Sequence, residues 1–242
     1  MTERDHLFRD PRNQIVDFVF DEAVAGVFGD MIRRSVPGYE TVIPLSGLAA
    51  ARHIDGLTDD SRTVYDLGCS LGATTLALLR QLGDAPASII AVDGSIAMIE
   101  RARTRVIDER VSFVHSDIRD LALEPAGAVL LNFVLQFITP DERATLLKRI
   151  HTALAPDGLL VVSEKLRFED PGEQAFYNSA HLDFKRANGY SDLEISQKRT
   201  ALENVMIIDS EEQHRERFAQ AGFRRTRKWF QCLNWVSFLV YP

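Results

Sequence analysis

The residues best suited to binding chemistry lie in a glycine-rich loop between an apolar strand and an apolar helix. The loop reads Asp66-Leu67-Gly68-Cys69-Ser70-Leu71-Gly72, and the helix after it is predicted to begin near Ala73. Glycine at such a turn either adopts backbone angles that other residues avoid or lets a ligand lie against the main chain. The spacing Asp-x-Gly-x-x-x-Gly lacks the G-x-G-x-x-G rhythm of a dinucleotide site, so the sequence argues against NAD.

A second acidic residue, Asp93, closes the next apolar run of the chain, residues 88–92. It follows Gly72 by about twenty residues, where an acid in nucleotide-binding folds accepts hydrogen bonds from the ribose hydroxyls. A glycine loop alone is common as plain structure, and the acid at the next strand end strengthens the case for a ligand. This pairing resembles the first two motifs of the class I S-adenosylmethionine (SAM) dependent methyltransferase fold, which binds SAM at its strand ends.

Three further candidate residues follow the next two predicted strands, 111–117 and 128–132. Asp117 and Ile118 lie at the end of the first of them. In the resembling fold, an acid here binds the exocyclic amine of adenine and a neighbouring backbone amide binds a ring nitrogen, although Asp117 alone fits a loop cap equally well. Asn132 ends the second strand, whose continuous apolar run is typical of a parallel sheet buried on both faces.

The elements that must position these residues alternate along the chain. The predicted strands 64–67, 88–93, 111–117, 128–132 and 159–164 alternate with helices that include 96–106, 139–153 and 210–221. Such alternation predicts a doubly wound, right-handed parallel sheet. Two antiparallel strands, 228–233 and 236–241, about an Asn234-Trp235 turn, complete a mostly parallel seven-stranded sheet. The predicted fold class is therefore α/β, of the class I SAM-methyltransferase type.

Two segments outside this alternation are predicted to cover the strand ends of a single domain, 1–242. Residues 1–55 are expected to contain two helices, 21–34 and 39–53, and an Asp59-Asp60 loop follows before the first strand. Residues 165–206 form a charged and aromatic insertion after the fifth strand, expected to be helical. An insertion this long at strand ends is normally a substrate cover.

The formal net charge of −7 narrows the range of partners. Nucleic-acid binding usually requires a basic face that displaces counterions from phosphates, so an acidic chain favours a small-molecule substrate and no direct nucleic acid. The basic run 224–228 is interpreted as a solvated edge strand. No apolar run approaches a membrane span, and the two cysteines lack disulfide or metal spacing, so the chain is expected to be cytoplasmic, with no metal and no membrane contact.

The insertion carries the most specific signal in the sequence. Residues 181–199 read HLDFKRANGYSDLEISQKR. Together with residues 31–39, 65–72 and 163–165, they closely resemble the bacterial carboxy-S-adenosyl-L-methionine (carboxy-SAM) synthases, and the likeness extends over nearly the whole chain. The resemblance implies an enzyme that converts SAM and prephenate to carboxy-SAM and phenylpyruvate. It also implies a homodimer whose product is passed to a separate enzyme that modifies wobble uridine in tRNA.

The same resemblance implies which residues form the site. The family's SAM contacts, transferred to matching positions, are Tyr39, Gly68, Cys69, Ser70, Asp93, Gly94, Asp117, Ile118 and Asn132. Arg199 is predicted to be catalytic, because its planar fork suits the second carboxylate of carboxy-SAM. Without the resemblance, Arg199 would be interpreted as a solvated arginine and Tyr39 as a core aromatic residue. Position 94 departs from the family, which commonly has Asn there, so only a backbone contact would be kept.

Two other functions fit the same SAM-binding residues. A conventional SAM-dependent methyltransferase acting on a small molecule or an RNA base differs only in its products. A non-catalytic SAM-binding module would hold SAM without turnover of prephenate. The sequence shows no Ser-His-Asp order and no protein nucleophile, and His181 fits helix packing or capping better than a catalytic base.

Overall fold

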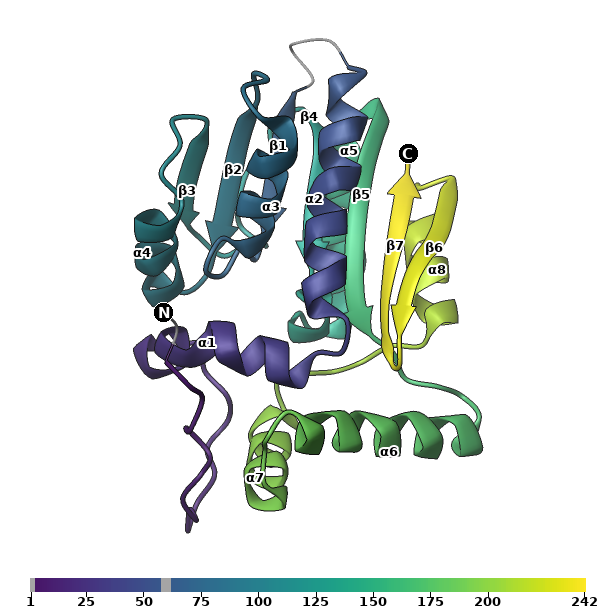
Figure 1. Cartoon of the computed structure of the whole chain (residues 1–242). Coiled ribbons are helices and arrows are strands. Elements are labelled where there is room, and N and C mark those ends of the chain that lie inside the picture. The colour runs from purple at the N-terminus through teal and green to yellow at the C-terminus, as the bar shows by residue number, and fades with distance from the viewer. Residues whose placement is uncertain (1–2, 58–61) are drawn as a thin grey trace.

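The computed structural model describes residues 3–57 and 62–242, and its centre is one seven-stranded sheet (Figure 1). The strand order is β3-β2-β1-β4-β5-β7-β6, in which β1 to β5 run parallel and β7 runs antiparallel to both of its neighbours. The strands are β1 Thr63–Leu67, β2 Ser88–Asp93, β3 Val111–His115, β4 Ala126–Asn132, β5 Leu154–Lys165, β6 Arg225–Cys232 and β7 Trp235–Tyr241. The predicted α/β class and mostly parallel seven-stranded sheet are confirmed. The predicted Asp59-Asp60 loop lies outside the described residues.

Helices cover both faces of the sheet (Figure 1). Apolar residues of α2, α3 and α4 pack on one face, and those of α5 and α8 pack on the other. The helices are α1 Glu22–Ser35, α2 Tyr39–Asp55, α3 Ala73–Leu82, α4 Ile96–Arg105, α5 Pro140–Ala153, α6 Pro171–Ala187, α7 Asp192–Leu202 and α8 Glu211–Gln220, with a short 3-10 turn η2 at Leu135–Phe137. Every residue of β4, the central strand, is buried, as its continuous apolar run predicts.

The helix boundaries follow from capping residues. The Asp21 side chain accepts a hydrogen bond from the backbone N–H of Val24, so α1 begins at the predicted acidic cap. Ser210 and Gln213 form the predicted reciprocal capping box at the start of α8. These local bonds satisfy N–H groups that have no partner inside the helix.

Several predicted boundaries were wrong; β6, for example, begins at Arg225 and not at 228, because Arg225 already pairs with Tyr241. The fifth strand begins at Leu154, five residues early, because Leu154 already pairs with Ala126; an irregularity in register then absorbs residues 155–158. The final hairpin turns at 233–234, because Trp235 pairs with Cys232 inside the ladder. A two-residue hairpin loop requires positive φ, and Leu233 adopts it with φ 51°. Trp235 is therefore a buried strand residue.

The covering segments lie beneath the carboxyl ends of the parallel strands, where α1, α6 and α7 meet (Figure 1). Hydrogen bonds join them to the N-terminal segment. The Tyr190 hydroxyl, between α6 and α7, donates to the Asp5 carboxylate. Arg34 of α1 donates to the backbone oxygens of Asp5 at 3.2 Å and Asn188 at 2.7 Å. The N-terminal segment, α1 and the insertion therefore pack as one unit.

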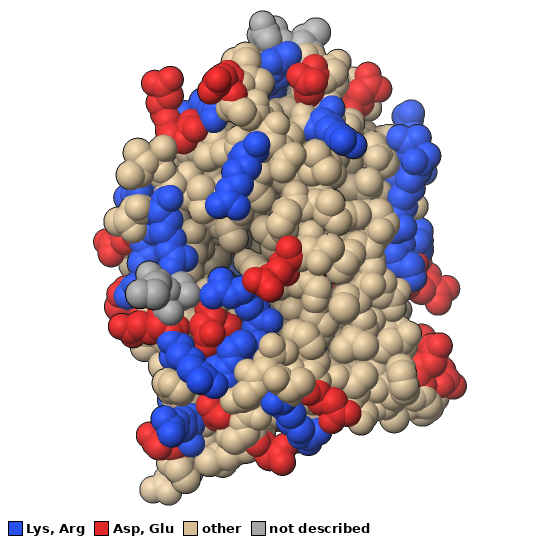
Figure 2. Space-filling model, viewed as in Figure 1, with Lys and Arg blue, Asp and Glu red and all other residues tan. Residues whose placement is uncertain are grey.

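Charge is distributed without a single dominant sign on the face shown in Figure 2, where acidic and basic side chains are interspersed. The basic run 224–228 lies at the start of edge strand β6, and most of its side chains are exposed. Lys228 pairs there with Glu211 at 2.8 Å, and the Arg225 guanidinium lies 4.1 Å from the ring centre of Tyr241. This is the solvated edge that the sequence predicts.

Candidate active site

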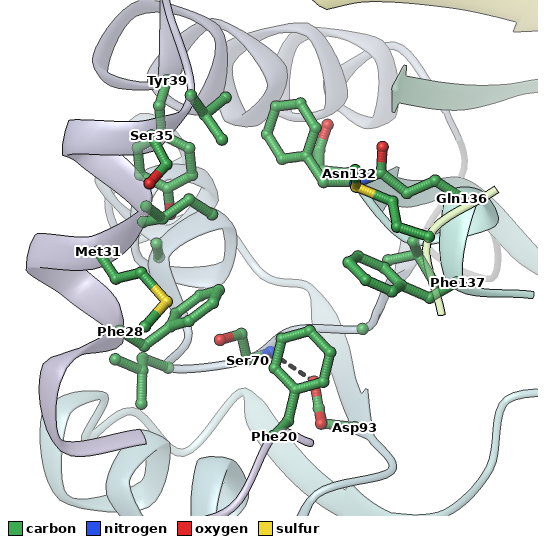
Figure 3. A pocket seen from close by; sticks show the side chains of 18 of the residues that line it. Phe20, Phe28, Met31, Ser35, Tyr39, Ser70, Asp93, Asn132, Gln136 and Phe137 are labelled. Atoms are coloured by element: carbon green, nitrogen blue, oxygen red, sulfur yellow. Dashed lines mark hydrogen bonds between the residues drawn. The ribbon is translucent and has the colours of Figure 1, made fainter. Parts of the chain in front are cut away.

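A cavity of about 650 Å³ lies where the strand ends meet the covering helices (Figure 3). Its volume is within the range of about 300–1,000 Å³ that is usual for small-molecule sites. Ligands in doubly wound sheets bind outside the carboxyl ends of the strands, which is where this cavity lies. All nine predicted SAM-binding residues line it: Tyr39, Gly68, Cys69, Ser70, Asp93, Gly94, Asp117, Ile118 and Asn132. Their contacts with SAM stay a prediction.

The glycine loop has the backbone that its sequence indicates. Gly68 and Gly72 have φ of 75° and 76°, and Ser70 between them also has a positive φ of 50°. A Cβ added at Gly68 would collide with the side chain of Val134, and the positive φ would strain it further. The loop is therefore a tight turn that leaves its main chain open to the cavity.

Asp93 is held by the loop that it faces. One carboxylate oxygen accepts from the backbone N–H of Ser70 at 2.8 Å, drawn as the dashed line in Figure 3, and the other accepts from Ser95 N–H at 2.8 Å. Burial raises the pKa of the Asp93 carboxyl, and these two hydrogen bonds oppose that rise. The carboxylate is fixed in place with lone pairs left for the hydroxyls of a ribose.

The predicted adenine-binding residues lie one strand further out. Asp117 is ion-paired with Arg119, whose Nη2 lies 2.6 Å from a carboxylate oxygen, and this partner holds the pKa of Asp117 below its usual range. Ile118 is buried and presents an apolar surface. The sequence did not indicate the Arg119 pair, which fixes the orientation of Asp117 before any ligand binds.

Asn132 is oriented by side chains from three other elements, of which Ser46 of α2 donates at the longest distance, 3.5 Å to Asn132 Oδ1. Its Oδ1 accepts from Ser163 Oγ at 2.6 Å, and its Nδ2 donates to Thr74 Oγ1 at 3.4 Å. The next residue, Phe133, has a positive φ of 63°, which is costly for a side chain of this size. Strain at the exit of the central strand is typical of a functional site.

The remaining predicted positions differ in character. Tyr39 packs beside Phe133 with ring centres 6.1 Å apart, and burial raises the pKa of its hydroxyl. The Cys69 thiol is buried, which raises its pKa strongly. Gly94 has open space around it, so an added Cβ would meet nothing within 4 Å. The departure from the family at position 94 therefore has no steric cause.

Arg199 lies apart from these residues. It is exposed on α7 and does not line the cavity, whereas its neighbour Lys198 is buried and does. On α7, Gln197 and Lys198 are buried and Ser196 and Arg199 are exposed, so the helix turns Lys198 and not Arg199 toward the cavity. Arg199 does not line the cavity of its own chain, although its charge acts on Lys185, which does. Its predicted role stays a prediction.

Several cavity residues were missed in the sequence. Three lysines, Lys165, Lys185 and Lys198, line it from β5, α6 and α7. Their spacing follows no single period, so no local pattern indicates that they converge. His181 also lines the cavity. Its Nε2 lies 2.8 Å from the Ser35 carbonyl oxygen, which fits the packing role that the sequence favours. Burial lowers the pKa of His181 to about 3, so it is neutral.

The described residues offer neither a metal-binding cluster nor a membrane-spanning helix. Among residues 3–57 and 62–242, no three His, Cys, Asp or Glu side chains come together as a metal-binding group. In the same part of the chain, no helix combines the length and apolar character that crossing a membrane requires.

Known proteins match this chain at the level of sequence and of fold. A family model described as a methyltransferase domain matches residues 64–158. The carboxy-S-adenosyl-L-methionine synthase of Pseudomonas aeruginosa (strain UCBPP-PA14) is 48% identical over 250 residues, covering 100% of both chains. The enzyme of that name from Shewanella amazonensis (strain ATCC BAA-1098 / SB2B) is 52% identical over 242 residues, covering 98% of both.

Solved structures share the fold at low identity. Human N-acetylserotonin methyltransferase in complex with SAM superposes with a TM-score of 0.59 at 16% identity, over 91% of this chain and 55% of that chain. A putative methyltransferase in complex with the Haloferax volcanii Trm112 methyltransferase activator gives a TM-score of 0.60 at 16% identity, over 93% and 99% of the two chains. These likenesses establish the SAM-methyltransferase fold.

Proposed function

The chain belongs to the family of the carboxy-S-adenosyl-L-methionine synthases and is therefore an enzyme that makes carboxy-SAM; we propose that prephenate supplies the carboxyl group and leaves as phenylpyruvate. The observation that carries the proposal is identity of 48–52% to such enzymes over essentially the whole chain, insertion included. The cavity supports it, because the glycine loop and Asp93 suit the nucleoside of SAM.

The proposed reaction needs positioning and a dry site more than a protein nucleophile. Prephenate loses hydroxide and carbon dioxide as it becomes phenylpyruvate. The hydroxide takes a proton from the SAM methyl group, which the sulfonium acidifies, and forms water. The resulting carbanion attacks the carbon dioxide, so the methyl group becomes a carboxymethyl group. Residues 1–55 and 165–206 would act as covers of the single domain 1–242 and retain carbon dioxide until it is captured.

Product analysis tests the proposal and its two alternatives. Purified protein is incubated with SAM and with prephenate labelled in the carboxyl group that is lost, and the nucleosides are examined by mass spectrometry. We expect SAM heavier by one labelled carbon dioxide, together with phenylpyruvate. S-adenosylhomocysteine and a methylated acceptor would instead indicate a conventional methyltransferase. Bound SAM with no consumption of prephenate would indicate a non-catalytic module.

Arg199 is proposed to act across a homodimer. It is exposed on α7 and outside the cavity of its own chain, so it would bind the product's new carboxylate in the site of a partner subunit. A guanidinium donates two parallel hydrogen bonds to a carboxylate and stays charged at any working pH. This role follows the family resemblance.

Carboxy-SAM is proposed to pass to a separate tRNA-modifying enzyme in the cytoplasm, without contact between this chain and tRNA. The net charge of −7 supports the absence of such contact. We expect filter-binding or fluorescence titration with tRNA to show weak, nonspecific binding that salt near physiological strength abolishes. Tight, sequence-selective binding under those conditions would contradict this prediction and revive an RNA methyltransferase.

A further inference from the structure

Within residues 3–57 and 62–242, three lysines line the cavity with fewer carboxylates in ion-pair distance than they carry charges. Lys165, Lys185 and Lys198 line the cavity from three different elements. Among the described residues, the side chains of Lys165 and Lys185 form no ion pair and donate no hydrogen bond. Lys198 donates to Ser35 Oγ at 2.9 Å and lies 3.9 Å from the carboxylate of Asp5. In the part of the chain that the structure describes, Asp5 is therefore the one carboxylate within ion-pair distance of these lysines, and it contacts only Lys198.

Such an arrangement is costly until an anion arrives. Burial lowers the pKa of Lys165 and of Lys198 to about 8. For Lys185, burial and then repulsion by Lys198, Lys165 and Arg199 lower the pKa to about 7. Lys198 is buried and Lys165 and Lys185 are half-buried, and ammonium groups withdrawn from water are stabilised as cations by pairing with an anion. A bound carboxylate would supply the missing partner and restore their ordinary proton affinity.

Aromatic side chains form the wall beside these lysines. Trp235 is 5% exposed, lines the cavity, and packs edge-on against Phe133 with ring centres 5.3 Å apart. Its indole N–H is buried and has no hydrogen-bond partner among the described residues. The His181 ring also packs edge-on against the indole, with ring centres 6.0 Å apart. A buried donor without a partner is rare in a folded protein, and this N–H is therefore free to donate to a ligand acceptor.

The opposite side of the cavity has the other sign of charge. Figure 3 shows Ser35 and Tyr39 across the cavity from Asp93, and Lys198 bonds to Ser35. Asp93 suits a ribose diol and repels an anion. The three lining arginines, Arg33, Arg105 and Arg119, are all exposed, and Arg119 is ion-paired with Asp117, so they do not replace the lysines.

Resting on the proposed function, we propose that Lys165, Lys185, Lys198 and the indole N–H of Trp235 form the subsite for the carboxyl donor, a ring acid with two carboxylates. The lysines neutralise the carboxylates and the aromatic wall packs on the ring. The subsite places the donor across the cavity from the nucleoside of SAM. It selects a cyclic dianion over a monoanion, because a single carboxylate leaves part of the cationic cluster unpaired.

Lysine variants with a matched control test the subsite. In Lys165→Gln and Lys185→Gln, the KM for prephenate should rise about ten- to a hundredfold, the cost of one lost charge-assisted bond, while the Kd of SAM stays within about twofold. Lys148→Gln, an exposed lysine on α5, is the control and should change neither. Wild-type KM in both variants, with carboxy-SAM still formed, would overturn the subsite and leave the proposed function intact.

A pH profile separates anion binding from a structural role. The groups that face the lysines are Asp5, Asp30, Arg34, His181 and Arg199. The free lysines lose protons between about pH 7 and pH 8, so the KM for prephenate should rise with pH above about 7. Lys185→Gln should flatten this rise. An unchanged profile in the variant would overturn the assignment of Lys185.

Direct binding keeps the two proposals distinguishable. If the wild-type protein makes no carboxy-SAM from prephenate, the proposed function fails. Calorimetry then titrates prephenate and the monoanion phenylpyruvate into SAM-loaded wild-type and Lys185→Gln protein. Tighter binding of the dianion, weakened about tenfold or more by the substitution, supports the subsite on its own. Equal binding to both proteins removes it.

Discussion

Replacing Asp93 with alanine is expected to raise the dissociation constant of SAM by about ten- to over a hundredfold. The carboxylate is proposed to accept hydrogen bonds from the ribose diol, and a hydrogen bond to a charged group contributes about 1.5–3 kcal/mol. The structure adds a second reason, because Asp93 also accepts from the backbone N–H groups of Ser70 and Ser95. Without it, the glycine loop loses the bond from Ser70 that ties it to the end of β2, and Ser95 loses its bond before α4.

Isothermal calorimetry with SAM measures this effect. Two further variants separate the loss of charge at Asp93 from a general effect of substitution. Asp93→Asn keeps an oxygen acceptor without charge and should lose less affinity than Asp93→Ala. Asp84→Ala, an exposed aspartate outside the cavity lining, should bind SAM like the wild type. Unchanged affinity in Asp93→Ala, with the circular dichroism spectrum of a folded protein, would remove Asp93 from the site.

Replacing Arg199 with alanine is expected to weaken carboxy-SAM binding by about tenfold or more and SAM binding by less than about twofold. The proposed partner of this guanidinium is the carboxylate that only the product carries, and a charge-assisted bond of about 1.5–3 kcal/mol corresponds to that ratio. Arg199→Lys should recover part of the loss, since it restores the charge and not the planar fork. Arg80→Ala, an exposed arginine on α3, is the control.

Mixed dimers decide whether Arg199 acts from a partner subunit. Asp93→Ala and Arg199→Ala proteins are each expected to be poorly active. If Arg199 enters the neighbouring site, a dimer of one chain of each kind contains one site with both residues intact. Mixing under conditions of subunit exchange should then recover activity.

Equal losses for SAM and carboxy-SAM in Arg199→Ala would falsify the carboxylate-binding role.

The fold and the nucleoside half of the site were predictable because their signals are local. Asp66, Gly68 and Gly72 are close in sequence, and Asp93 closes the very next strand. Parallel strands bring their carboxyl ends to one edge, so topology alone gathers Asp93, Asp117 and Asn132.

The lysine half of the cavity was not predictable, because its residues are far apart in sequence and no local pattern brings them together. Lys165 ends a strand, whereas Lys185 and Lys198 lie on two helices whose mutual angle no local pattern fixes. The orientation of α7 also decided which residue of its basic pair faces inward. The family resemblance directed attention to Arg199, while packing buried Lys198. The hairpin turn was misplaced by one residue. Asn234 indicates a turn, but the pairing of Trp235 with Cys232 decides where that turn lies.

The bond between Tyr190 and Asp5 spans 185 residues of sequence, whereas the bond between Ser70 and Asp93 spans 23. Contacts between distant segments form only after both have been synthesised, and closing so long a loop slows folding. The glycine loop can thus be completed on a nascent chain of modest length. The N-terminal segment around Asp5 can form its bond with Tyr190 only after the last quarter of the chain has begun to leave the ribosome. During synthesis, a partly finished chain would therefore have the nucleoside half of its site in place while the cavity beside it is still open to water.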